Sequence, residues 1–260
     1  MATTSSSLGK LSSSNVTYVS ALYNCYSSSG VSDRLLKDVA ILLQQKLHLI
    51  IFVDDFYFHQ LSQLPMSSTV KLVRYDLDNS VIYNMIIANK ERLQLPTHRN
   101  VEKDTHEYIA LMNSKIEFLK LARLCTSSPY LGWIDAGSSK MISDPDSSYA
   151  KLAELQLKGG LGVLIPGCYQ RPAEIKWLMN NVWWSYLGTF FVCESCTVEQ
   201  FYRYSVQSLV KFFIKGIVVW EVNIWVDISQ DHPSLFTWYA ADHNDSFTNI
   251  PIEYHNTSGQ

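Results

Sequence analysis

Asp135 stands at the point of this chain where residue types most clearly suggest chemistry. It follows the apolar segment 130–134, which reads as a buried strand, and it precedes the small residues 136–139 (AGSS). A carboxylate delivered into a turn of small side chains can hold a diphosphate and a hard cation such as Mg²⁺ or Mn²⁺ through oxygen. Aspartate is also common in ordinary tight turns, so the pattern alone leaves both interpretations open.

Three further residues stand beside predicted strands or on a predicted helix. Asn24 follows the first predicted strand, Asp54 ends the second, and Lys115 lies on the helix that precedes Asp135. The Lys115 ammonium could neutralise a phosphate as a point charge. Most lysines on helices are simply solvated, and strand ends often carry solvated carboxylates, so these alternatives stay open.

Glu221 lies in the apolar run 217–225 (IVVWEVNIW), where a carboxylate is costly to bury without a partner or a task. Desolvation would suit it to act as a general base toward a hydroxyl group. The alternative is an ordinary buried ion pair with Lys211, Lys215 or Arg203.

The elements that position these residues alternate between strand and helix. Strands are predicted at 15–23, 48–53, 70–75, 130–134, 161–165 and 183–192, and helices at 33–46 (capped by Ser32), 107–125 and 197–214. This rhythm predicts an α/β fold with a mostly parallel central sheet flanked by helices. Ligands of such sheets bind beyond the carboxyl ends of the strands. Gly188, inside segment 183–192, suggests a place where a ligand approaches the backbone.

Composition limits the class of protein further. Of 260 residues, 21 are Lys or Arg and 24 are Asp or Glu, so the net charge is −3 and no basic cluster supports nucleic-acid binding. The longest apolar stretch, 208–226, contains charged residues, which argues against a membrane span. We expect a disordered tail at 1–14 without a signal peptide, one domain at 15–260, and a cytoplasmic location with unpaired cysteines. Sequence motifs of kinases, dehydrogenases, zincins and common hydrolases are absent.

Three strings, 21–26 (ALYNCY), 113–122 (NSKIEFLKLA) and 132–137 (GWIDAG), together resemble the HtrL/YibB (WlaTC) family. That family is associated with bacterial surface polysaccharide and is treated as glycosyltransferase-like. The resemblance implies a GT-A-like (Rossmann-like) domain. It also implies transfer of a sugar from a nucleoside-diphosphate donor, a UDP- or GDP-sugar, to a hydroxyl of a glycan acceptor.

The resemblance also implies roles for single residues. In the GT-A fold an Asp-x-Asp motif holds the metal and the donor; Asp135 matches its first position, whereas Gly137 stands at the second. A divalent metal, Mn²⁺ or Mg²⁺, would then need His243 or another late residue as a ligand, or would be replaced by a basic side chain. Asp54, with Asn24, would contact the nucleoside.

The resemblance also implies that Lys115 contacts the donor phosphates. Asn113 and Ser114, in the same string 113–122, are weaker candidates for this role. Glu221 would be the base if the enzyme inverts the sugar configuration. Two rival interpretations remain: an inactive nucleotide-sugar- or carbohydrate-binding protein on the same fold, and a glycoside hydrolase that uses a pair of acids.

Overall fold

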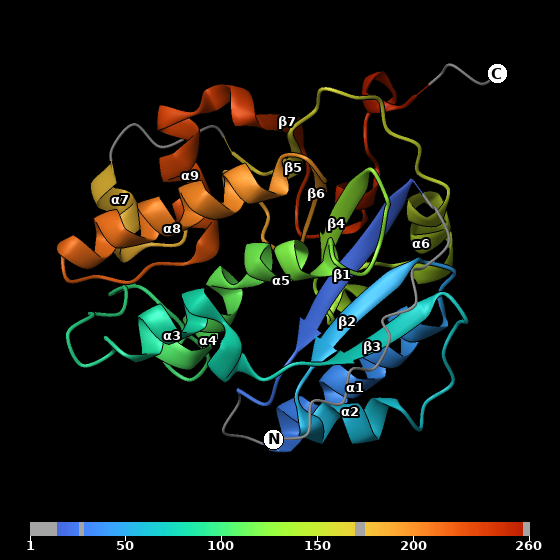
Figure 1. The fold of residues 1–260 in the computed structure, drawn as a ribbon, viewed down its shortest axis with the longest axis horizontal. Coiled ribbons are helices and arrows are strands. Elements are labelled where there is room, and N and C mark those ends of the chain that lie inside the picture. The colour runs from blue at the N-terminus through green and yellow to red at the C-terminus, as the bar shows by residue number, and fades with distance from the viewer. Residues whose placement is uncertain (1–14, 26–28, 170–174, 257–260) are drawn as a thin grey trace.

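The computed structural model describes residues 15–25, 29–169 and 175–256, and contains one seven-stranded sheet in the order β3-β2-β1-β4-β6-β5-β7 (Figure 1). The predicted tail at 1–14 lies outside the described residues. The strands are β1 (Val16–Leu22), β2 (Leu49–Val53), β3 (Val70–Arg74), β4 (Tyr130–Ile134), β5 (Val163–Gly167), β6 (Phe190–Glu194) and β7 (Phe236–Ala240).

The sheet is mostly parallel, as the sequence predicted. The pairs β1–β2, β2–β3, β1–β4 and β5–β7 are parallel, and only β6 runs antiparallel to its neighbours β4 and β5. The order β3-β2-β1-β4 is that of the first half of a doubly wound fold. The chain moves outward in one direction from β1 to β3 and then returns to the other side of β1 with β4. The carboxyl ends of β1 and β4 therefore form a topological switch point, where such sheets bind their ligands.

Helices cover both faces of the sheet (Figure 1). The described α-helices are α1 (Ser29–Gln44), α2 (Asp55–Leu61), α3 (Val81–Ile87), α4 (His106–Asn113), α5 (Lys115–Ala122), α6 (Pro145–Ala153), α7 (Ile175–Asn180), α8 (Val198–Ile214) and α9 (Glu221–Asp231). The apolar core is divided accordingly. Val19 of β1 packs in a cluster with residues of α4, α5, α8 and α9, whereas its neighbour Tyr18 packs in a second cluster with residues of α1 and α6.

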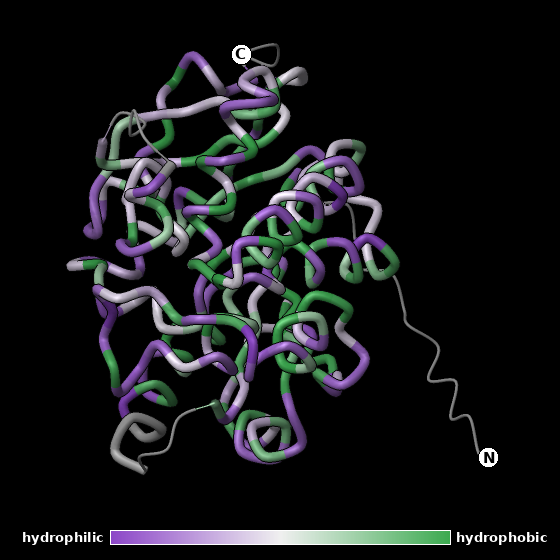
Figure 2. Tube along the Cα trace, turned by 90° about the vertical axis from the view of Figure 1, so that its left-hand side faces the viewer, coloured by the Kyte–Doolittle hydropathy of each residue, from purple (hydrophilic) through white to green (hydrophobic). Residues whose placement is uncertain are grey.

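This division follows from the alternation of side chains along a strand, because neighbouring residues point to opposite faces of the sheet. In Figure 2 many helical turns alternate between green and purple, as expected of helices with one buried face. No helix within the described part of the chain is long and apolar enough to cross a membrane.

The predicted helix 107–125 is wrong in one respect, because the structure divides it into α4 and α5 at Ser114. The Ser114 hydroxyl donates to the carbonyl of Ala110, at 2.8 Å, and the Asn113 side-chain amide donates to the carbonyl of Ile109, at 2.9 Å. Polar side chains that bond back to the preceding turn compete with the helical pattern. Apolar periodicity continues across the break and so conceals it. As a result, α5 begins at Lys115.

Two other element predictions are also corrected. The strand expected at 183–192 is β6 at Phe190–Glu194, so Gly188 lies before the strand rather than inside it. Helix α1 begins at Ser29, so Ser32 lies within its first turn and not at its N-cap.

Candidate functional site

A pocket of about 420 Å³ opens at the switch point between β1 and β4. Its wall includes Tyr23, just after β1, and Asp135, just after β4. Helix α5 contributes Lys115 and helix α9 contributes Glu221. Of the residues predicted for the site, Asp135, Lys115, Glu221, Gly137 and His243 line this pocket; Asp54 and Asn24 do not.

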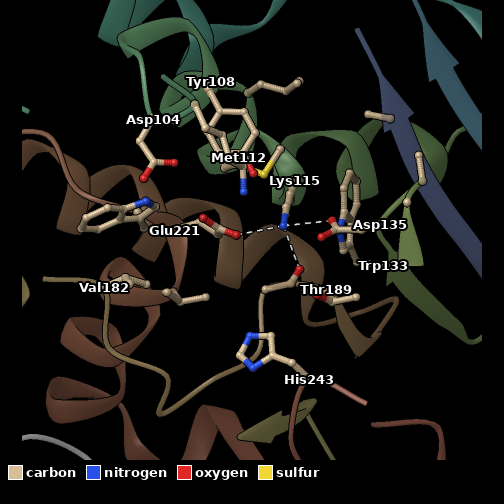
Figure 3. A pocket seen from close by; sticks show the side chains of 18 of the residues that line it. Asp104, Tyr108, Met112, Lys115, Trp133, Asp135, Val182, Thr189, Glu221 and His243 are labelled. Carbon is tan, nitrogen blue, oxygen red and sulfur yellow. Dashed lines mark hydrogen bonds and ion pairs between the residues drawn. The ribbon is translucent and has the colours of Figure 1, made fainter. Parts of the chain in front are cut away.

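Lys115 lies at the centre of the pocket floor and is held by three acceptors (Figure 3). Its ammonium donates to Oε1 of Glu221 and to the carbonyl of Gly188, each at 2.8 Å, and lies 3.0 Å from Oδ1 of Asp135. Only 2% of the side chain is exposed. This burial excludes the alternative of a solvated lysine on a helix surface. Since an ammonium has three protons, these three acceptors fill its capacity as a donor.

Asp135 is fixed on one side and open on the other. Its Oδ1 accepts the indole N–H of Trp133 at 2.7 Å as well as the Lys115 ammonium, and its backbone N–H donates to the carbonyl of Thr189 at 2.9 Å. No partner of Oδ2 is found among the described residues, and 32% of the side chain is exposed. The carboxylate therefore has a fixed orientation with one oxygen available to a ligand.

Glu221 is the first residue of α9, and 7% of its side chain is exposed. It does form a buried ion pair, as one of the two alternatives held, but its partner is Lys115 and not Lys211, Lys215 or Arg203. Lys211 instead pairs with Asp227 and Asp231 on α9.

Gly188 allows this ion pair to form next to the backbone. A Cβ atom at Gly188 would lie 2.4 Å from Oε1 of Glu221 and 3.3 Å from Nζ of Lys115. A side-chain methyl of Val222 would lie 3.2 Å away, so the groups that approach this glycine are three side chains of the protein.

The charges on the pocket floor sum to −1, because one ammonium lies between two carboxylates. Burial by itself would lower the pKa of Lys115, but the carboxylates of Asp135 and Glu221 outweigh burial and raise that pKa above its usual value. Lys115 is therefore a fixed positive charge at neutral pH.

Two other lysines of the pocket have no carboxylate within ion-pairing distance among the described residues. Lys140 is exposed, and the Lys103 ammonium lies 4.6 Å from the ring centre of Tyr108. Desolvation lowers the pKa of Lys103, although Asp104 opposes this shift. A Cβ at Gly137 would lie 3.9 Å from the Lys140 ammonium, so a positive charge stands near the position where an Asp-x-Asp motif places its second carboxylate.

Asp54 and Asn24 meet in a second hollow, and Tyr23 lines both this hollow and the main pocket. Asp54 caps α2 by accepting the backbone N–H of Tyr57 at 2.8 Å, and its Oδ2 accepts the backbone N–H of Asn24 at 2.9 Å. The aspartate thus ties the loop after β1 to the end of β2. The two residues lie together, as their positions after adjacent parallel strands predict.

His243 belongs to the main pocket but also to a separate group of potential ligands. Its Nδ1 lies 3.9 Å from Sγ of Cys168 and 3.4 Å from Oδ1 of Asp242. Among the described residues, these three form the only group of three or more side chains arranged to hold a metal ion. Asp135 is not a member, so a shared site for Asp135 and His243 remains a prediction.

The surroundings of Asp135 fit Mg²⁺ or Mn²⁺ poorly. Both ions prefer about six oxygen ligands. Asp135 has one oxygen free, and Gly137 supplies no carboxylate; an added Cβ there would already lie 3.0 Å from Cδ1 of Leu35. We assign no step of a reaction to a metal at this position.

Asn113 and Ser114 have structural roles and do not line the pocket. The Asn113 side-chain amide also donates to the carbonyl of Val219 at 2.9 Å, which secures the segment leading into α9. Glu117, in the same string, accepts from the backbone N–H groups of Val81 and Ile82 at the start of α3, at 2.8 and 3.0 Å. Much of this sequence string therefore holds helices together around Lys115.

Trp133, Lys103 and Lys140 also line the pocket but were not predicted from the sequence, and only Trp133 has a recognisable sequence signal. Trp133 lies two residues before Asp135, and residues spaced by two share one face of a strand. Lys103 and Lys140 come from a loop and a short 3-10 helix, Ser138–Met141, and no periodic pattern marks them.

No family model matches the sequence, and no curated protein matches it. The fold is similar to the crystal structure of mouse xyloside xylosyltransferase 1 in its apo form, with a TM-score of 0.48 and 10% sequence identity over 87% of this chain and 85% of that chain. A similarity this low carries no argument about activity, which must be judged from the pocket itself.

Proposed function

We propose that the protein is a glycosyltransferase that moves a sugar from a nucleoside-diphosphate donor to a hydroxyl of a glycan or glycoconjugate. One observation carries the proposal: a pocket at the switch point combines two ammonium groups, Lys103 and Lys140, which have no ion-pair partner among the described residues, with two carboxylates oriented by Lys115. The pocket therefore offers positive charge for a diphosphate and oriented acceptors for sugar hydroxyls.

In this proposal the donor spans both hollows. The diphosphate lies near Lys103 and Lys140, which meet its negative charge as point charges. The nucleoside lies beyond Tyr23, in the hollow lined by Asn24 and Asp54. The free Oδ2 of Asp135 accepts a hydrogen bond from a sugar hydroxyl.

The transfer step breaks the bond between the anomeric carbon and the diphosphate oxygen while the acceptor oxygen bonds to that carbon. The leaving diphosphate carries away the bonding electron pair, and the two lysines stabilise its charge. If the reaction inverts the configuration, Glu221 takes the proton of the acceptor hydroxyl. In a retaining reaction the leaving diphosphate oxygen takes that proton instead, and Glu221 then has only its structural role.

A second candidate function is donor or glycan binding without transfer. It is favoured by the same ion pair, because Lys115 holds one oxygen of each carboxylate and the candidate base is not free to rotate. Both candidate functions include a UDP- or GDP-sugar and a glycan as ligands, and both include a cytoplasmic location.

A thermal-shift screen against UDP-, GDP-, CMP- and dTDP-sugars, with and without Mn²⁺, tests the binding part. A ligand at a concentration of about 100 times its Kd should stabilise the folded protein by about 2.7 kcal/mol. We expect one nucleotide sugar to stabilise the protein selectively without added Mn²⁺. Lys140→Ala should remove most of this stabilisation. Lys46→Ala should not, because Lys46 lies in another hollow. If no nucleotide sugar stabilises the protein, the proposal fails.

Release of the nucleoside diphosphate from the selected donor, in the presence of a panel of glycan acceptors, then separates the two candidates. Turnover that requires acceptor supports the transferase, and selective binding without any turnover supports the binding protein. Glycan cleavage in the absence of a nucleotide sugar would instead support a hydrolase.

A further inference from the structure

Cys168, Asp242 and His243 converge beside the pocket, which His243 alone of the three lines. The Cys168 thiol donates to Oδ1 of Asp242 at 3.4 Å, and its Sγ lies 3.9 Å from Nδ1 of His243. Nδ1 of His243 lies 3.4 Å from the same Asp242 oxygen. Three different ligand types thus present their atoms to one point.

The sheet itself brings these residues together. Strands β5 and β7 are parallel neighbours in the register Gly167↔Ala240, so their carboxyl ends stop side by side. Cys168 is the first residue after β5. The backbone N–H of Ala241 donates to the carbonyl of Gly167 at 3.0 Å and extends the pairing by one residue beyond β7. Asp242 and His243 follow directly after Ala241.

The local contacts also fix the ligands. The His243 ring packs edge-on against Trp184, with 4.5 Å between the ring centres. The Trp184 carbonyl accepts the backbone N–H of Cys168 at 2.9 Å, so one residue supports both ligands. The backbone N–H of His243 donates to Oδ1 of Asp242 at 2.7 Å and orients that carboxylate. A hydrogen bond to the carboxylate, as here to Asp242, is typical of carboxylates that bind metals.

The three separations match tetrahedral zinc coordination. With Zn–S near 2.3 Å and Zn–N and Zn–O near 2.0–2.1 Å, tetrahedral angles place nitrogen and oxygen about 3.3 Å apart and sulfur about 3.6 Å from each. The observed separations of 3.4, 3.4 and 3.9 Å differ from these values by a few tenths of an ångström. The mixed sulfur, nitrogen and oxygen set suits Zn²⁺ and not Mg²⁺ or Mn²⁺.

We propose that Cys168, Asp242 and His243 bind a zinc-class divalent cation and leave its fourth coordination position open. Binding replaces the S–H bond of Cys168 with an S–metal bond and releases that proton to solvent, while Asp242 and His243 bind as carboxylate and neutral imidazole. Because His243 also lines the main pocket, the cation lies at the pocket rim. The site does not depend on the proposed glycosyl transfer.

Titration of the purified full chain with Co²⁺ tests the site without requiring activity. One equivalent should bind, with the visible absorption of tetrahedral Co²⁺ and a near-ultraviolet thiolate-to-cobalt charge-transfer band. Cys168→Ser should abolish the charge-transfer band, and His243→Ala should weaken binding at least about 10-fold, the loss typical of weakened metal sites. The matched control is Cys196→Ser, since Cys196 is an exposed cysteine of another loop and should keep the full signal.

The thermal midpoints of the metal-free proteins show whether each variant folds. Addition of Zn²⁺ should raise the midpoint of the wild type and of Cys196→Ser, but not that of Cys168→Ser. A wild-type protein without the charge-transfer band, or a band that survives in Cys168→Ser, would overturn the proposal. Loss of the band in Cys196→Ser would place the metal at Cys193 and Cys196 and would also overturn it.

Discussion

Replacement of Lys115 by methionine tests the structural core of the site. The change keeps most of the side-chain length but removes the ammonium that lies between Asp135 and Glu221. Lys115 and Glu221 are 2% and 7% exposed, so Glu221 would keep a buried charge without its partner. Removing one partner of a buried ion pair costs about 3–5 kcal/mol. We expect a loss of that size in the free energy of unfolding, measured by urea denaturation.

The matched control is Lys120→Met on the same helix. Lys120 pairs with Glu199 at 3.2 Å, but these side chains are 39% and 47% exposed. Exposed pairs contribute about 0–1 kcal/mol because water and salt screen them. The two variants therefore compare the loss of a buried ion pair with the loss of an exposed ion pair of similar length.

A double-mutant cycle isolates the interaction itself. Glu221→Gln should cost less than Lys115→Met, because Lys115 keeps Asp135 and the Gly188 carbonyl as acceptors. The double variant has no unpaired buried charge at Glu221. Its loss in the free energy of unfolding should therefore be about 1–3 kcal/mol smaller than the sum of the two single-variant losses. Equal losses for Lys115→Met and Lys120→Met, or strict additivity in the cycle, would refute the reasoning.

The remaining predictions concern the same floor of the pocket. Gly188→Ala should destabilise the protein by about 1–3 kcal/mol, because the new methyl would overlap Oε1 of Glu221, whereas Gly159→Ala meets no atom within 4 Å and should not. Trp133→Phe removes the indole N–H that donates to the carboxylate after β4, and should cost about 1.5–3 kcal/mol in urea denaturation. The pKa of Lys115 is higher in the folded protein than its usual value of 10.5, so the charged lysine stabilises the fold fully below pH 10.5. This stabilisation is lost as the pH rises through the folded-state pKa. The free energy of unfolding of the wild type should therefore fall more steeply above pH 10.5 than that of Lys115→Met.

The sequence predicted most of the sheet because β1, β2 and β4 are buried, largely apolar runs without a charged side chain, as buried parallel strands require. Asp135 was found at the pocket because it directly follows such a run. The break at Ser114 could not be found in this way, because the apolar periodicity of α4 continues into α5. That break determines where Lys115 lies.

The partners of the charged residues were the least predictable part of the site. Glu221 was recognised as a buried carboxylate, but its nearest basic residues along the chain are Lys211 and Lys215, and its partner is Lys115, 106 residues away. Pairing at that distance depends on how α5 and α9 pack and not on local sequence. Cys168 meets His243 only through the pairing of β5 with β7.

A structure of the protein bound to the nucleoside diphosphate selected by the thermal-shift screen tests the central claim most directly. We predict the diphosphate between Lys103 and Lys140, and the nucleoside in the hollow of Asn24 and Asp54. Ordered nucleotide found outside both hollows, with the pocket above Lys115 filled only by solvent, would contradict the account.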